Sequence, residues 1–168
     1  QKSVVKDMQD AFSYVFQHPP VLGLIFLSII PFLFGMTINT MLPAFNEEVL
    51  IGGADDLGLL MSAMGIGAIL GSLLLAGASD FQNRSLWLIG TCIGWGLLTS
   101  AFGLSDSFAT SIVLIAFIGF ISSWNMSLNR GLLQLQVEDH MRGRILSVDM
   151  MSHGLMPLGV IPISLIAE

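Results

Sequence analysis

Five long apolar segments separated by short polar connections dominate the sequence. They cover residues 21–45, 57–78, 86–104, 108–129 and 145–167. A helix needs about 20 mostly apolar residues to cross the hydrocarbon core of a bilayer, and each segment is long enough. None alternates apolar and polar residues as a transmembrane strand does, and a helix satisfies its backbone amides internally. The pattern therefore predicts an all-α membrane protein with five transmembrane helices.

Residues 1–19 follow a different pattern. An apolar stripe with spacings of three and four residues runs through this stretch, formed by Val5, Met8, Phe12 and Val15. Such spacing is typical of an amphipathic helix, and Pro19-Pro20 ends it. Two interpretations stay open for this helix. It lies along the cytoplasmic face of the membrane, or it is a linker helix packed on protein, since two lysines attract anionic lipid only weakly.

The composition supports a membrane protein. Of the 168 residues, 54% are apolar and 11% are charged, against roughly 25% charged in ordinary soluble domains. The mean hydropathy is +0.80. With so few charged residues, this chain could not form the polar surface that a soluble domain of its size needs. We therefore expect the lipid bilayer as a partner. The net charge of −6 argues against nucleic acid as a partner.

The charged residues divide between the two sides of the predicted bundle. The basic residues all fall on one side, and they are Lys2, Lys6, Arg84, Arg130, Arg142 and Arg144. In the connections on the other side, every charged residue is acidic, and these residues are Glu47, Glu48, Asp55, Asp56 and Asp106. The positive-inside rule makes the basic side cytoplasmic, which places the N-terminal end inside. Because the chain starts with Gln1 and stops directly after an apolar run, we expect a segment of a longer protein.

Small residues and prolines predict how these helices pack. A stripe of small residues at four-residue spacing, Ala63, Gly67 and Gly71, predicts close contact with a neighbouring helix. Kinks are expected at the prolines inside the first and fifth segments, namely Pro31, Pro157 and Pro162. The third segment contains no charged residue, so we expect it to face lipid.

An acidic residue lies inside the fifth apolar segment. A charged side chain at mid-membrane costs about 3 kcal/mol on insertion scales, so it usually faces the bundle interior. Asp149 is this residue, and His153 follows one turn later on the same face. The pair could carry a proton, because histidine titrates near neutral pH. Alternatively, Asp149 lies near the cytoplasmic end and pairs with Arg142 or Arg144.

Two segments also carry polar stripes. Asn125 and Asn129 share a face of the fourth segment beside Trp124, and Asn39 lies on a polar face of the first segment. These four residues are candidates for lining a cavity that binds a small-molecule substrate. The same amides could instead form hydrogen bonds between helices, worth under about 1 kcal/mol each.

Enzymatic chemistry finds little support. Ser79 and His153 invite comparison with an intramembrane serine protease, but their expected depths in the membrane differ. Nucleotide, dinucleotide and metalloprotease motifs are missing from the sequence. Three histidines and a single cysteine, all far apart, form no metal-ligand cluster. We therefore predict no enzyme, no metal and no cofactor.

Two loops carry a resemblance to a known family. Residues 76–84 resemble the inter-helix signature of the major facilitator superfamily, in which Asp80 and Arg84 match while Ala76 and Asn83 replace glycines. Residues 134–144, with Gln134 and with Arg142-Gly143-Arg144, are similar to the loop between helices ten and eleven of its drug-proton antiporter and siderophore (enterobactin-type) exporter branch. Glu138 stands where that branch usually has proline, and residues 58–71 are similar to its eighth helix.

The resemblance implies that residues 20–168 form helices seven to eleven of a twelve-helix transporter. Residues 1–19 would end the linker between its halves, and the absent N-terminal half would be a partner. It implies proton-coupled efflux of amphipathic small molecules by alternating access, in a bacterial inner membrane. The residues implied at the cytoplasmic gate are Asp80, Arg84, Gln134, Arg142 and Arg144. A non-transporting membrane scaffold or subunit remains the alternative.

Overall fold

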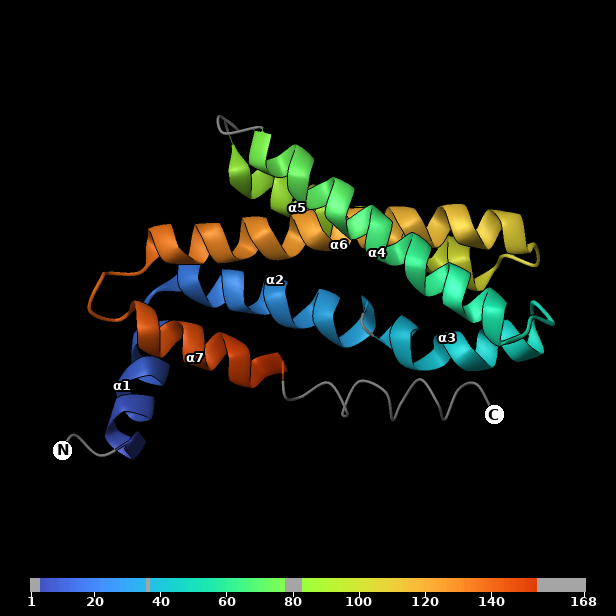
Figure 1. Cartoon of the computed structure of the whole chain (residues 1–168). Helices are drawn as coiled ribbons and strands as arrows, with labels where there is room; N and C mark the ends of the chain where they lie inside the picture. The colour runs from blue at the N-terminus through green and yellow to red at the C-terminus, as the bar shows by residue number, and fades with distance from the viewer. Residues whose placement is uncertain (1–3, 36, 78–82, 154–168) are drawn as a thin grey trace.

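The computed structural model describes residues 4–35, 37–77 and 83–153. Every regular element in these ranges is an α-helix (Figure 1). The helices are α1 (Val4–Gln17), α2 (Pro19–Gly35), α3 (Thr37–Glu48), α4 (Ala54–Gly77), α5 (Arg84–Gly103), α6 (Phe108–Gln136) and α7 (Arg142–His153). The predicted all-α architecture is thereby confirmed for the part of the chain that is described.

Three of the helices, α4, α5 and α6, are long and apolar enough to cross a membrane. They coincide with the second, third and fourth predicted segments, although α6 continues to Gln136, beyond the predicted end at 129. A fourth span results if α1 and α2, bent by 106° at His18, count as one. The fifth predicted segment comprises α7 and residues beyond 153 that lie outside the described ranges. The number of five spans therefore stays a prediction.

The first predicted segment contains two of the described helices, α2 and α3. Pro31 lies inside α2. Proline has no N–H, so Pro31 cannot donate to the carbonyl of Leu27 one turn earlier. The Cys92 thiol of α5 donates to this oxygen instead, in a weak contact of 3.9 Å. The other two predicted kinks, Pro157 and Pro162, lie outside the described residues.

Glycine brings α4 and α6 into backbone contact. A Cβ on Gly67 would overlap the Ala116 carbonyl oxygen, and one on Gly119 would overlap the carbonyl oxygen of Met64. A Cβ on Gly71 would lie 2.6 Å from the Phe120 carbonyl oxygen. The structure thus places Gly67 and Gly71 at this crossing and Ala63, half-buried, in the apolar cluster beside it. Close backbone approach is how membrane helices gain contact energy in lipid.

Helix α1 packs on the protein with one face. Ala11 and Val15 are buried in an apolar cluster that includes Ile145, near the start of α7, and Val137, in the connection before it. Of the predicted apolar stripe, Val15 is buried in the protein and Phe12 is 44% exposed. Positions 11 and 12 are both apolar, and consecutive helical residues point about 100° apart, so the sequence pattern cannot choose between them. The packed face therefore contains Ala11.

The expectation that the third segment faces lipid holds for only one side of α5. Leu86, Ile93 and Leu97 are exposed, as expected. The other side packs against α2 and α6 and buries Leu88, Thr91, Trp95 and Phe102. Figure 1 shows α2 lying between α6 and α7, so that four helices contribute to the interior near the middle of the described bundle.

Candidate functional site

Polar side chains from α2, α5, α6 and α7 converge on one small internal pocket. Its volume is about 10 Å³. The polar residues that line it are Ser28, Trp95, Asn125, Asn129, Arg130 and Asp149. Three residues that the sequence analysis selected for two different roles therefore share a single site. These are the amides Asn125 and Asn129 and the carboxylate Asp149.

The two amides hold neighbouring helices together. Asn129 Nδ2 donates to the Leu24 carbonyl oxygen of α2 at 2.9 Å. Asn125 Nδ2 donates to Thr91 Oγ1 at 3.1 Å and lies 3.0 Å from Cys92 Sγ, both on α5. Interhelical hydrogen bonding, one of the two interpretations left open by the sequence, is therefore present, and both amides also line the pocket.

Asp149 is buried in the second half of α7, with 2% of its surface exposed. The two arginines considered as partners make ion pairs nearer the start of this helix. Arg142 Nη1 lies 2.7 Å from Asp139, and Arg144 Nη1 lies 3.6 Å from Asp10 of α1. A buried carboxylate among membrane-embedded helices is costly, and such groups usually mark ion or proton pathways.

The remaining cavity candidates lie elsewhere. Trp124 is on the opposite side of α6, where its Nε1 donates to the Gly71 carbonyl oxygen and its ring meets Trp87 edge-on at 6.1 Å. Asn39 is half-buried on α3. His153 is the last described residue of α7, and the structure describes its backbone but not its side chain. The structure therefore brings together three of the six cavity and coupling candidates.

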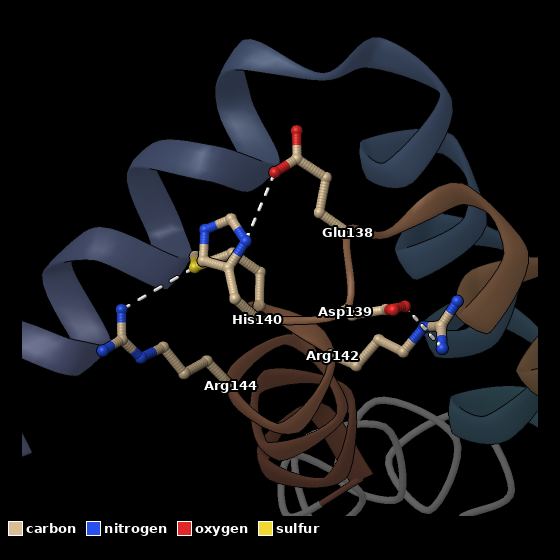
Figure 2. Close-up of polar contacts among 6 residues, drawn as sticks. Glu138, Asp139, His140, Arg142 and Arg144 are labelled. Atoms are coloured by element: carbon tan, nitrogen blue, oxygen red, sulfur yellow. Dashed lines mark hydrogen bonds and ion pairs between the residues drawn. The ribbon is translucent and has the colours of Figure 1, made fainter.

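The loop before α7 is fixed by its own polar contacts (Figure 2). Arg142 Nε donates to the Gln134 carbonyl oxygen at 2.9 Å while its guanidinium pairs with Asp139. His140 Nδ1 lies 3.3 Å from a Glu138 carboxylate oxygen, and both side chains are largely exposed. Gln134 and Arg142, two predicted gate residues, are thus joined through the backbone of α6.

The other predicted gate loop is described only at its end. Asp80 lies outside the described residues, and Arg84 is the first residue of α5. Asn83, immediately before it, has a left-handed backbone conformation with φ of 64°. Glycine adopts this conformation most easily and asparagine tolerates it well. This explains physically why asparagine can stand where the resembling signature has glycine.

Trp95 and Thr91 are site residues that the sequence analysis missed. Both lie on α5, one turn apart, with Leu88 on the same buried face. A signal was available, because the three polar or amphipathic groups Thr91, Cys92 and Trp95 cluster in an otherwise apolar segment. Within the described ranges, no group of three or more His, Cys, Asp or Glu residues could hold a metal ion.

A larger pocket lies where α3 approaches the end of α5. Its volume is about 390 Å³, and its walls are largely apolar, with Phe45, Phe102 and Met41 among the lining residues. Glu48 contributes a carboxylate and Thr99 a hydroxyl group. The small pocket and the large pocket therefore differ in chemistry, because only the small one is surrounded by buried amides and a buried carboxylate.

Apolar membrane-length helices enclosing a buried polar site define a polytopic membrane protein, and the comparisons with known proteins specify which kind. The sequence profile described as "Transmembrane secretion effector" matches residues 1–168. The chain belongs to this family, which is part of the siderophore and drug exporter branch of the major facilitator superfamily. Its members are transporters and not enzymes. No solved structure matches the chain.

Three curated relatives illustrate the family. The chain is 29% identical over 136 residues to the staphyloferrin A transporter of Staphylococcus aureus (strain NCTC 8325 / PS 47), covering 80% of the chain and 34% of that protein. It is 22% identical over 167 residues to macrolide efflux protein A of Streptococcus pyogenes, covering 98% and 41%. It is 25% identical over 141 residues to the enterobactin exporter EntS of Escherichia coli O1:K1 / APEC, covering 84% and 33%. The chain thus spans about a third to two fifths of these proteins.

Proposed function

We propose that the chain is part of a secondary transporter that exports amphipathic small molecules in exchange for protons. The observation that carries the proposal is Asp149, a carboxylate with 2% of its surface exposed that shares a pocket with two buried amides. The relatives include a staphyloferrin A transporter, a macrolide efflux protein and an enterobactin exporter, and these support the substrate class. His153, one turn beyond Asp149, is the second candidate for proton exchange.

The proposed orientation follows from charge. The basic connections lie in the cytoplasm of a bacterial cell, the protein lies in the inner membrane, and α1 is the last part of the linker between two halves. The packing of α1 on α7, together with the ion pair between Asp10 and Arg144, supports a fixed attachment of this linker to the C-terminal half. The loop residues Asp80, Arg84, Gln134, Arg142 and Arg144 form the cytoplasmic gate.

The proposed mechanism is alternating access. A substrate binds near Asn125 and Asn129, between this half and the N-terminal half, and the two halves rock around it. A carboxylate that takes up a proton loses its charge, so the free-energy cost of enclosing it in a dry bundle falls. Protonation of Asp149 from outside would therefore favour one orientation, and its deprotonation to the cytoplasm would favour the other.

The test is the Asp149→Asn variant of the full-length protein in proteoliposomes with an imposed pH gradient. The substrate is a radiolabelled macrolide or enterobactin, whichever the wild type carries. We expect at least a tenfold loss of gradient-driven transport, with exchange of labelled for unlabelled substrate retained. Asp106→Asn, which neutralises an exposed carboxylate in the connection between α5 and α6, is the matched control. Gradient-driven transport by Asp149→Asn at the wild-type rate would contradict the coupling role.

A further inference from the structure

The small pocket contains buried polar atoms that no described residue satisfies. Trp95 Nε1 and Asn129 Oδ1 are both buried and have no hydrogen-bond partner within residues 4–35, 37–77 and 83–153. Trp95 is 3% exposed and Asn129 is 2% exposed, and both line this pocket. Buried donors and acceptors in folded proteins almost always have a partner, so each such group calls for an explanation.

The two atoms have complementary requirements. An indole N–H can only donate a hydrogen bond, whereas an amide oxygen can only accept one. The nitrogen of Asn129 is already used in its bond to the Leu24 carbonyl oxygen, which fixes the amide oxygen on the other side of the group. A molecule that accepts from Trp95 and donates to Asn129 would satisfy both atoms at once.

The size of the pocket restricts what this molecule can be. A volume of about 10 Å³ is near the lower limit that holds one water molecule, and it excludes a drug-sized ligand. A bare metal cation is disfavoured, because the indole N–H offers it no lone pair. Buried waters typically make about three hydrogen bonds to protein groups that otherwise lack partners.

We propose that one ordered water molecule occupies this pocket. It accepts a hydrogen bond from Trp95 Nε1 and donates one to Asn129 Oδ1. Its second hydrogen is directed to the carboxylate of Asp149, which lines the same pocket and can accept several hydrogen bonds. The water thereby connects α5, α6 and α7.

This water would be the group through which Asp149 exchanges its proton, a step that rests on the proposed function. A proton arriving from solvent converts the water to hydronium. One O–H bond of the hydronium then breaks as an O–H bond to the Asp149 carboxylate forms, and the water is restored. The reverse transfer releases the proton. Trp95 and Asn129 act here as positioning residues, because they hold the water and do not themselves change protonation.

The experiment is infrared difference spectroscopy of the full-length protein in lipid nanodiscs, recorded across a pH step in ordinary water and in water labelled with oxygen-18. We expect an O–H stretching band that shifts with the isotope in the wild type and is absent from Trp95→Phe, which keeps an aromatic side chain but removes the N–H donor. Trp87→Phe is the control, because Trp87 lies on the same helix, is 46% exposed and does not line the pocket; it should keep the band.

Either of two results would overturn the water site: no isotope-sensitive band in the wild type, or an unchanged band in Trp95→Phe. Should Trp95→Phe fail to fold, a density map of the wild type fine enough to show waters replaces it, and an empty pocket then refutes the site. The proposed function is tested by a different measurement, gradient-driven transport by Asp149→Asn, so its failure can be distinguished from failure of the water site. Loss of the band in Trp95→Phe with unchanged gradient-driven transport would refute the proton route alone.

Discussion

Helix α6 packs against its neighbours in two different ways on its two sides. Toward α4, Gly119 meets the backbone of Met64, and Gly67 meets the backbone of Ala116, with no side chain between them. Toward α2 and α5, Asn125 and Asn129 form interhelical hydrogen bonds and border a small pocket. Glycine-mediated backbone contact dominates the α4 side, which also has the hydrogen bond from Trp124 to the Gly71 carbonyl oxygen, whereas buried amides connect α6 to α2 and α5.

The difference shows which interactions each side can change. Dispersion contacts between backbones are short-ranged, so the α4 side tolerates no added atom. Hydrogen bonds between side chains can exchange partners, and a pocket with unused donors and acceptors can admit a water or a proton. In the proposed transport cycle we therefore expect the polar side to rearrange and the glycine side to keep its geometry.

The largest effect should come from adding a methyl group at the glycine crossing. Gly67→Ala would place its Cβ on the Ala116 carbonyl oxygen, and overpacking of this kind costs about 1–3 kcal/mol or more. Gly65→Ala is the matched control on the same helix, because its Cβ would meet nothing within 4 Å. Thermal unfolding of the full-length protein in detergent measures both. Equal melting temperatures for the two variants would contradict the steric account.

A smaller effect is expected from the polar side. Asn129→Leu removes the hydrogen bond to the Leu24 carbonyl oxygen, and such interhelical bonds contribute about 0.6 kcal/mol on average and at most about 1.7. Ser127→Leu, at an exposed position two residues earlier, is the control. The same unfolding assay should give a lower melting temperature for Asn129→Leu alone. A loss as large as that of Gly67→Ala would mean that the two sides do not differ as proposed.

The smallest effect concerns the Leu27 carbonyl, which Pro31 leaves without its helical donor. Cys92→Ala removes the thiol that contacts this oxygen at 3.9 Å. In a Pro31→Ala background the new N–H can bond to Leu27, so the same cysteine change should cost less. A double-mutant cycle of unfolding free energies should give a coupling of under about 1 kcal/mol, in line with weak hydrogen bonds. The bond from Asn125 to Cys92 is lost in both backgrounds and cancels. A coupling of zero would show that the thiol does not replace the missing donor.

Much of the architecture could be predicted because membrane burial acts on whole segments. Apolar length is enough to locate α4, α5 and α6 to within a few residues at most ends. The buried face of α1 was ambiguous, since Ala11 and Phe12 are adjacent and both apolar.

The candidate site was predictable where a polar residue is unusual for its segment. Asp149, Asn125 and Asn129 stand out in apolar helices, and the structure brings them to one pocket. Trp95 was harder to select, because the importance of a tryptophan depends on where its single N–H points. That direction depends on how α5 is rotated against α2 and α6, which periodicity in one segment cannot determine.

The glycine crossing has a mechanical consequence. Because their backbones are in contact, α4 and α6 cannot slide or rotate against each other without steric overlap, so they behave as one rigid unit. Opening the small pocket then requires α2, α5 or α7 to move relative to this rigid pair. Helix α4, although it lines no part of the small pocket, thus helps to hold α6 in place while the polar helices move.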